Sequence, residues 1–463
     1  MEGGGSAGLA MLSTVLVARL LGPTDFGAIM SIFTVVQVGS YFAENTFNDA
    51  LVRRPQLGDD HTTTAYAASI AIGVALAVAF AVGNYWIAGF FGDATLGPAV
   101  VLAGFTLILN GLCSVPMTLL RHDLRFRDLA LRTIYARIAG TVTVVVALAC
   151  GLGIWSVVVQ NLAAGAVNVA CLVPLMRRAS RGRVTWAALR DLIPVSVFSS
   201  STMLLAVIAQ RVFLVLISVL FGPLALGLYM IGLRTVDVLR TLLQNSARQL
   251  LFRRMAVRQS DMAAMRRLYL DATQLGAAVT LPVFTGIYLC APQIITVFLQ
   301  PQWHGAVDAF RGFCIASALF GTRMFDGLVY NTLGRAQMNL ILTAAAVATY
   351  LAVLSVIYVT GVGSPVDAMI AQTVIATLIS APIVARAINL QTRDQFGGLL
   401  MILAAVAVMT GAVLWVRHSF LSEATPLRTL VAMAAVGALT YALALLVVAP
   451  RTFHQFRTLA LGR

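Results

Sequence analysis

The side chains that could do chemistry in this sequence are charged and polar residues set inside strongly apolar segments. An arginine at the centre of a membrane helix costs about 2.5 to 3.5 kcal/mol on insertion scales, so such residues usually face a cavity. The planar guanidinium fork suits phosphate oxygens. An isolated acidic site suits a proton or Na⁺. The sequence therefore favours binding of an anion and of a small cation.

Two segments carry these residues at spacings of three and four, which place them on one helical face. The first lies within residues 26–50 and has Gln37, Tyr41, Glu44, Asn45, Asn48 and Asp49. The second lies within residues 226–252 and has Arg234, Asp237, Arg240, Thr241, Gln244, Asn245 and Arg248. The first stripe is net acidic and the second is net basic.

The basic stripe and Arg211 are the candidates for binding an anionic group, with Arg211, Arg234, Arg240 and Arg248 as ligands. Glu44 and Asp49 are the candidates for a coupling ion. A structural alternative stays open, because Asp237 lies three residues from both Arg234 and Arg240 and can neutralise either. Asp49 is likewise within reach of Arg53, and Arg323 with Asp326 is expected to be a structural pair.

These residues must be held by membrane helices, because 59% of the chain is hydrophobic and only 11% is charged. A soluble domain carries roughly 25% charged residues. Apolar runs of about twenty residues, enough to cross the bilayer core, recur along the whole chain. The sequence predicts an all-α polytopic membrane protein with fourteen spans, at residues 5–21, 26–50, 62–90, 97–120, 134–152, 154–176, 193–220, 226–252, 268–299, 306–333, 338–359, 364–390, 397–416 and 428–449.

The distribution of arginine predicts the orientation of these spans. All 32 basic residues are arginine, and alternate loops hold 21 of them. The opposite set of loops holds two, Arg417 and Arg428. Because basic residues are kept in cytoplasmic loops, both termini are expected in the cytoplasm.

A repeat divides the chain. Laying residues 18–54 on 218–254 without a gap gives eleven identities, among them Gly-Pro, Asn and Arg-Arg. Both copies start on the same side of the membrane, which makes a parallel repeat, and such repeats commonly hold a substrate between them. The expected organisation is an N-terminal six-helix lobe at 1–176, a cytoplasmic linker at 177–192, a C-terminal six-helix lobe at 193–390, an extra helix pair at 397–449 and a cytoplasmic tail at 450–463.

Other classes of function have no support in the residues. The five cysteines lie in apolar runs with no CxxC spacing, and the five histidines form no cluster. No Gly-rich phosphate loop or nucleophile elbow is present. The chain is therefore expected not to be an enzyme and to need no metal or cofactor, and its basic charge is explained by topology rather than by nucleic acid.

The runs "ARLLGPTDFG", "ALVRRPQL", "VPMTLLRHDLRFRDLALR" (115–132) and "GLGIWSVVVQNLAAG" (151–165) resemble the polysaccharide transporter family. Within it, the chain resembles the branch of colanic-acid and exopolysaccharide exporters. The family belongs to the superfamily of MATE-type transporters and lipid II flippases. The resemblance covers most of residues 8–400, and in the second lobe it depends mainly on "LFGPLALGLYMIG".

The resemblance implies a flippase for undecaprenyl-pyrophosphate-linked oligosaccharide in the bacterial inner membrane, serving exopolysaccharide or lipopolysaccharide biosynthesis. It implies alternating access, cavity arginines that engage the pyrophosphate, a gradient of H⁺ or Na⁺ as the drive, and polysaccharide polymerase or assembly proteins as partners. Lipid II is an alternative cargo that would also suit a cationic cavity, and two other functions stay open. One is a MATE-like cation-coupled drug antiporter, and the other is a non-transporting scaffold of a polysaccharide assembly complex.

Overall fold

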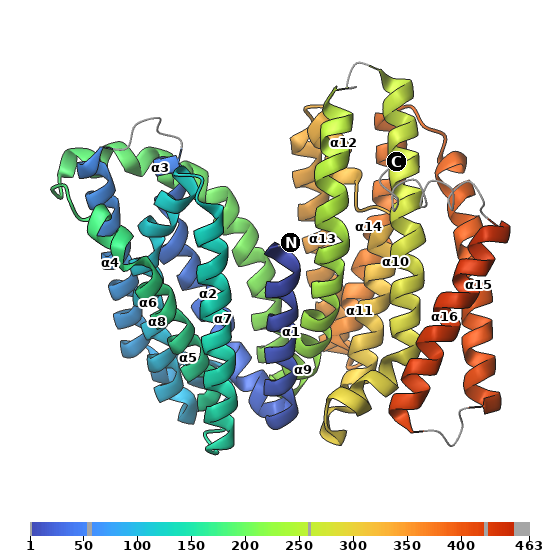
Figure 1. Cartoon of the computed structure of the whole chain (residues 1–463), viewed down its shortest axis with the longest axis horizontal. Coiled ribbons are helices and arrows are strands. Elements are labelled where there is room, and N and C mark those ends of the chain that lie inside the picture. Colours follow the sequence, from blue (N-terminus) through green and yellow to red (C-terminus); the bar gives the residue numbers. More distant parts are fainter. Residues whose placement is uncertain (1, 53–57, 258–260, 421–424, 449–463) are drawn as a thin grey trace. The chain divides into compact units, whose positions relative to one another are not determined.

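A computed structural model describes residues 2–52, 58–257, 261–420 and 425–448. Throughout these ranges the chain forms helices joined by short turns, with no strand (Figure 1). Twelve helices of the described residues are long and apolar enough to cross a membrane. The predicted all-α, multi-pass membrane architecture is confirmed.

The structure does not confirm the count of fourteen spans. Among the residues whose side chains are described, α1 (Glu2–Leu20) contributes the apolar helix Met11–Leu20, which is not one of the twelve. Further on, the predicted spans 193–220 and 226–252 both fall within α9 (Trp186–Val257), of which Gln210–Leu243 is one candidate span. Within α9 the backbone is kinked between these two predicted spans, at Gly222. Its φ of +85° suits a residue without a side chain.

The chain divides into two compact units, Met1–Met230 and Ile231–Arg463, and the lobe boundaries expected from the sequence stay predictions. Unit 1 holds α1, α2 (Pro23–Asn45), α3 (Asn48–Val52), α4 (Asp59–Val82), α5 (Asn84–Phe90), a 3₁₀ turn (Ala94–Leu96), α6 (Gly97–His122), α7 (Phe126–Ala149), α8 (Trp155–Ala179) and the first part of α9. Unit 2 holds the rest of α9, α10 (Met262–Phe298), a 3₁₀ turn (Pro301–Trp303), α11 (Ala306–Gly321), α12 (Asp326–Thr332), α13 (Ala336–Thr360), α14 (Pro365–Ala387), α15 (Thr392–Phe420) and α16 (Pro426–Val448).

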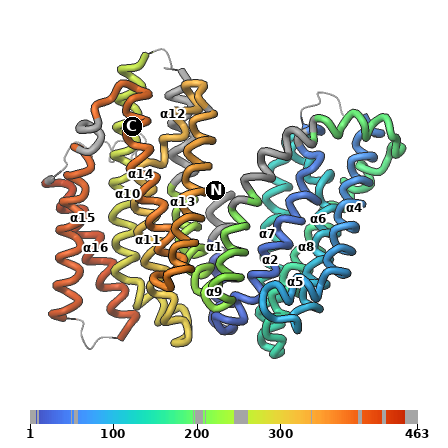
Figure 2. Tube along the Cα trace, turned by 180° about the vertical axis from the view of Figure 1, so that it is seen from behind, coloured from blue at the N-terminus to red at the C-terminus, as the bar shows by residue number. Residues whose placement is uncertain are grey.

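In unit 1, α6 packs against α2, α4 and α8, and α7 against α8 (Figures 1 and 2). Glycines permit the close approach of α4 to α6. A Cβ at Gly73 would lie 2.6 Å from the carbonyl oxygen of Leu107, and one at Gly111 would lie 2.6 Å from that of Ser69. Small residues let membrane helices gain van der Waals contact where no hydrophobic effect drives them together.

The repeated Gly-Pro motifs contact each other inside unit 1. A Cβ on Gly27 would overlap the carbonyl oxygen of Pro223, and a Cβ on Gly227 would overlap that of Pro23. One turn further, the hydroxyls of Ser31 and Ser218 are 2.6 Å apart. The two copies of the motif therefore form one reciprocal contact, in which each glycine receives the backbone of the other copy.

In unit 2, α10 packs against α11, α15 and α16, while α14 packs against α11 and α13 (Figure 2). Two apolar clusters fill these interfaces. One joins α10, α12 and α14 around Tyr269 and Phe325. The other joins α10, α15 and α16 around Leu281 and Ile402. Helix α10 is therefore shared by both clusters of this unit.

Gly27→Ala is expected to destabilise the protein by about 1 to 3 kcal/mol, the usual cost of overpacking, because the new methyl group meets a backbone carbonyl that cannot rotate away. Gly227→Ala should cost a similar amount. The double variant should cost less than the sum, since one separation of the backbones makes room for both methyl groups. Thermal unfolding in detergent measures this.

Gly411→Ala in α15 is the matched control, because nothing lies within 4 Å of a Cβ at that position. A Gly27→Ala protein that unfolds at the same temperature as Gly411→Ala would contradict the reciprocal contact.

Candidate functional site

The polar stripe of α2 is used in part for packing. Three contacts link α2 and α3 to α6 at a constant offset of 70 residues. Asn110 donates to the Ser40 hydroxyl (2.9 Å), Ser114 donates to the carbonyl oxygen of Glu44 (2.8 Å), and Thr118 donates to the Asn48 side chain. The constant offset means that two parallel helices meet along matching i, i+4 rows. We call these contacts the α2–α6 ladder, and it gives Asn48 a structural role.

The carboxylate of Glu44 takes no part in this ladder, which uses only its backbone carbonyl. The side chain is half-buried, and among the described residues Arg132 and Arg121 act on it electrostatically. Sequence reasoning placed both arginines in a cytoplasmic loop and did not connect them with Glu44. The side chain of Asp49, the other candidate for a coupling ion, lies outside the described residues.

The four candidate anion ligands have different surroundings. Arg211 belongs to unit 1 and is half-buried, and its Nε–H has no hydrogen-bond partner among the described residues. Arg234 belongs to unit 2, is half-buried and interacts with neighbouring groups. The side chain of Arg248 lies outside the described residues. The structure thus leaves Arg211 and Arg234 as half-buried cations within apolar helices.

Arg240 forms an ion pair with Asp237, which the sequence allowed as a structural alternative. Both side chains are about 40% exposed, at 39% and 43%, so this pair adds little stability. The guanidinium of Arg240 also lies over the ring of Phe320, 5.4 Å from its centroid. Arg323 lies over the same ring at 5.4 Å. One aromatic ring therefore gathers two guanidinium groups from distant parts of the sequence, a contact that no spacing rule reveals.

The span Ala306–Thr332 is broken near Arg323. Helix α11 ends at Gly321, residues 322–325 form a turn, and α12 begins at Asp326. Irregular backbone at membrane depth is tolerated where it is buried in protein or lines a cavity. The predicted ion pair between Arg323 and Asp326 is not formed among the described residues. Asp326 instead accepts a hydrogen bond of 2.9 Å from the Tyr269 hydroxyl.

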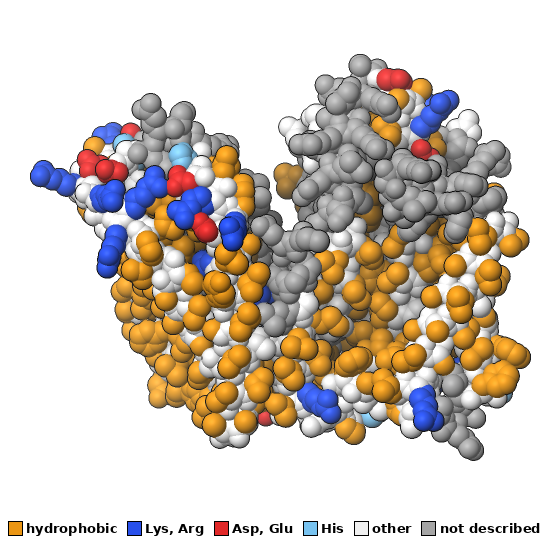
Figure 3. Space-filling model, in the orientation of Figure 1, with side chains coloured by type: hydrophobic (Ala, Val, Ile, Leu, Met, Phe, Trp, Pro, Cys, Tyr) orange, Lys and Arg blue, Asp and Glu red, His pale blue; other side chains and the backbone are white. Residues whose placement is uncertain are grey.

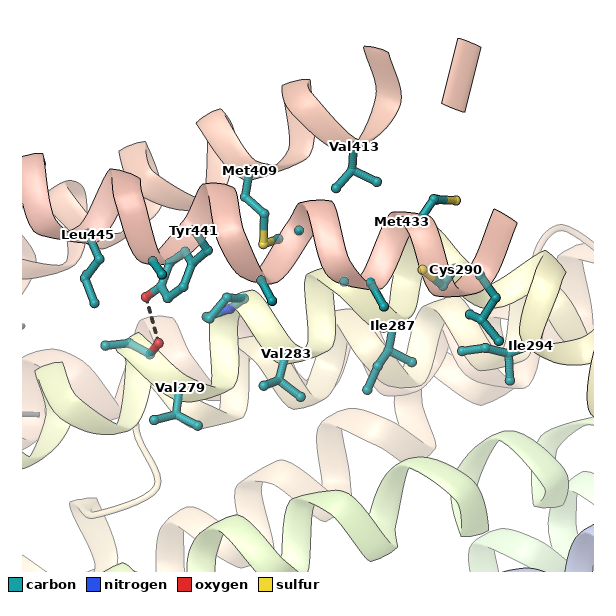
Figure 4. Close-up of a pocket in the computed structure, with 18 residues that line it drawn as sticks. Val279, Val283, Ile287, Cys290, Ile294, Met409, Val413, Met433, Tyr441 and Leu445 are labelled. Carbon is teal, nitrogen blue, oxygen red and sulfur yellow. Dashed lines mark hydrogen bonds between the residues drawn. The ribbon is translucent and has the colours of Figure 1, made fainter. Parts of the chain in front are cut away.

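An apolar cavity of about 590 Å³ lies between α10, α15 and α16 (Figure 4). We call it the α10–α16 groove. Its lining runs along α10 from Ala278 to Ile294, which is about 24 Å at 1.5 Å per residue. Figure 4 shows Val283, Ile287 and other aliphatic side chains on its wall. This length approaches the roughly 30 Å of a bilayer core, so the groove suits an extended hydrocarbon chain.

One polar contact lies at the end of this groove. The hydroxyl of Tyr441 donates a hydrogen bond of 2.7 Å to the carbonyl oxygen of Ala278 (Figure 4). That carbonyl has lost its helical partner because residue 282, four positions on, is a proline without an N–H. Tyr441 therefore ties α16 to α10 and satisfies a backbone group that hydrocarbon could not.

Apart from Arg19 of α1, the exposed arginines described in unit 1 gather at one end of its helices, above flanks of apolar side chains (Figure 3). They come from the C-terminal ends of α6 and α8, the start of α7 and the segment that follows α8: Arg121, Arg125, Arg127, Arg177, Arg178, Arg181, Arg183 and Arg190. Two of them pair with acids, Arg125 with Asp128 and Arg178 with Asp123, both at 2.6 Å. The gathering fits the orientation expected from the sequence.

Among the described residues, no group of three or more His, Cys, Asp or Glu side chains is placed to hold a metal ion. The arrangement that is present combines guanidinium groups, a broken helix and a long apolar groove. Such an arrangement can bind an amphipathic anion.

Residues 16–308 match the family described as "Polysaccharide biosynthesis protein". One similar relative is the succinoglycan biosynthesis transport protein ExoT of Rhizobium meliloti (strain 1021), which is 23% identical over 302 residues. The alignment covers 65% of this chain and 60% of the relative.

Two solved structures are similar to the whole fold. A lipid II flippase, MurJ, in an inward closed conformation has a TM-score of 0.76 at 12% identity and covers 96% of both chains. An inward-facing multidrug resistance MATE family transporter of the MOP superfamily has a TM-score of 0.61 at 15% identity, over 86% of this chain and 94% of the other. At such low identity these likenesses establish the MATE/MOP-like fold.

Asn48→Leu is expected to destabilise the protein by about 1 kcal/mol, because it removes two side-chain hydrogen bonds at a buried position. Glu44→Gln should leave the stability within about 0.5 kcal/mol, because none of the hydrogen bonds found among the described residues uses the carboxylate. Thermal unfolding of the two variants separates packing residues of the stripe from residues left for function. Equal losses from both variants would contradict this division.

Proposed function

The chain belongs to the polysaccharide biosynthesis protein family, and from this premise we propose that it is a flippase for undecaprenyl-pyrophosphate-linked oligosaccharide repeat units. It moves these lipids from the inner to the outer leaflet of a bacterial inner membrane, for exopolysaccharide or lipopolysaccharide synthesis. The relative named above is a succinoglycan transport protein, which supports a polysaccharide precursor as the cargo.

One observation carries the proposal: unit 2 combines a long apolar groove with a pair of guanidinium groups, which together suit the two ends of such a lipid. The α10–α16 groove is apolar over most of the bilayer thickness and suits a polyprenyl chain. The guanidinium groups of Arg240 and Arg323 meet at Phe320, and Met324 and Phe325 of the same turn lie against Gly276 of α10. Both sites therefore border α10.

The pyrophosphate is the part of the cargo that arginine recognises. In this proposal its oxygens are bound by the four arginines expected from the sequence, Arg211, Arg234, Arg240 and Arg248. We add Arg323 as a fifth ligand because it shares the ring of Phe320 with Arg240. A planar guanidinium can donate two parallel hydrogen bonds to one phosphate group, which gives affinity and orientation together. The two repeats then expose the site to each side of the membrane in turn.

The proposal also includes the orientation of the chain in the membrane. We place both termini in the cytoplasm, as the arginine-rich loops favour.

Glu44 and Asp49 remain candidates for H⁺ or Na⁺ coupling, and a polysaccharide polymerase is the expected partner on the outer face. The chain needs no catalytic group for this activity, because no covalent bond of the lipid changes.

The drug-antiporter alternative is less well supported. A MATE-like transporter of organic cations needs groups that accept hydrogen bonds or carry negative charge, whereas the cluster around Phe320 presents two guanidinium groups, which only donate hydrogen bonds. A non-transporting scaffold is also less well supported, because it has no need of half-buried arginines inside membrane helices, where each is costly.

Gly286→Phe tests the groove. The glycine lines it and has open space within 4 Å of a Cβ, so the new ring fits without strain and occupies the place of the lipid chain. Binding of a fluorescent polyprenyl-pyrophosphate oligosaccharide to the protein in nanodiscs should weaken about tenfold or more, which is roughly 1.4 kcal/mol. Gly411→Phe, in open space on α15 outside the groove, is the matched control and should bind normally.

Replacing Arg234 and Arg240 together with Ala tests the anionic site. Each charge-assisted hydrogen bond contributes about 1.5 to 3 kcal/mol, so the double variant should bind the same probe at least about 100-fold more weakly. Arg428→Ala, at an exposed position near the start of α16, is the control and should bind like the wild type. Normal binding and export by the double variant would exclude this assignment.

A further inference from the structure

Asp326 is the most deeply buried acidic residue that the proposed function has not used. Its side chain is only 5% exposed, at the first position of α12 after the break in the span. One carboxylate oxygen, Oδ1, accepts the hydrogen bond from Tyr269. The other oxygen, Oδ2, is buried and has no hydrogen-bond partner within 3.5 Å among the described residues, although the Ser380 hydroxyl of α14 also acts on this carboxyl group. A buried carboxylate with an unsatisfied oxygen is costly, so its retention calls for a physical reason.

The space in front of Asp326 is a cavity of about 290 Å³ with both apolar and polar side chains on its wall. Its wall is built by the turn after α11 and by α12, α13 and α14. The polar side chains on it are Arg323, Asp326, Tyr330, Asn339, Thr343, Thr349 and Ser380. Within the described part of the chain, the buried hydroxyl of Tyr330 is also without a hydrogen-bond partner. A cavity of this volume has room for several water molecules, each occupying about 30 Å³, and its polar side chains can bind them.

The charged neighbours of Asp326 limit what the cavity can bind. The titratable and charged groups that face it are Tyr269 on α10, Arg323 in the turn and Tyr330 on α12. The α13 and α14 side chains on the cavity wall are uncharged. A sodium ion would lie beside the guanidinium of Arg323 with a single carboxylate to hold it. A proton needs only the free oxygen Oδ2.

We propose that Asp326 binds and releases a proton, and that this sets the net charge of the arginine cluster around Phe320. With both acids ionised, Asp237 and Asp326 balance Arg240 and Arg323. When Oδ2 takes a proton from cavity water, the same four residues carry one net positive charge, which favours an anionic headgroup. Release of the proton to water restores neutrality and favours release of the headgroup.

This inference rests on the proposed function for its purpose, but the proton site itself can be tested without any lipid. The pH-dependent infrared difference spectrum of the purified protein, recorded from about pH 5 to about pH 9, reports protonated carboxyl groups by their C=O stretching band. We expect a titrating band in the wild type that is absent from Asp326→Asn. Asp326→Glu should retain a titrating band, which separates loss of the carboxyl group from misfolding.

Tyr269→Phe provides a second signature. The proton on Oδ2 leaves Oδ1 as the C=O oxygen that accepts from Tyr269, so removing this donor should move the band to higher frequency. Glu44→Gln is the comparison variant, and we expect it to leave this band in place. Loss of the band in Glu44→Gln, with no effect of Asp326→Asn, would overturn the proposal in favour of unit 1.

Identical spectra from the wild type and Asp326→Asn would also overturn it. So would a band in the wild type that addition of NaCl removes but addition of choline chloride does not, because Na⁺ would then be the ion bound. A confirmed proton site in a protein that moves no polyprenyl lipid would refute the flippase and leave the site intact. The two proposals are therefore separable.

Discussion

The structure depends on one constraint: inside a bilayer, polar groups must be satisfied by the protein itself. Hydroxyl and amide side chains link α2 and α3 to α6 at a constant spacing. Tyr441 satisfies the carbonyl that Pro282 leaves free. Because most polar groups follow this constraint, the few that do not are informative. Arg211, Arg323 and Asp326 are among the described residues with unsatisfied buried atoms, and the proposals above assign them to a ligand or a proton.

Close backbone contact is the second requirement, and it explains the sequence repeat. Membrane helices gain stability from packing at short range, which needs small residues at the contact. Gly27 and Gly227 each receive the carbonyl of a proline from the other copy, Pro223 and Pro23. A reciprocal contact of this kind constrains both copies equally. Glycine is therefore required at both positions, for a reason that is structural before it is functional.

The sequence predicted the fold class, the family resemblance and the positions of most spans, because long apolar runs and Gly-Pro motifs are local signals. The sequence could not show which polar residues of the first stripe are used for packing. Asn48 bonds to α6 through its side chain, whereas Glu44 bonds to α6 only through its backbone carbonyl, and spacing does not reveal this difference. The sequence paired Arg323 with Asp326 by spacing, whereas the break in the helix directs Asp326 to Tyr269. The groove was also missed, because apolar lining residues look like any membrane helix.

Translocation in sealed proteoliposomes tests the central claim most directly. The purified protein is reconstituted with a fluorescent polyprenyl-pyrophosphate oligosaccharide, a pH or Na⁺ gradient is imposed in either direction, and the probe left in the outer leaflet is quenched over time. The account predicts protein-dependent movement of this lipid between leaflets. No movement of any such lipid, together with gradient-driven efflux of small organic cations, would contradict it and favour a drug antiporter.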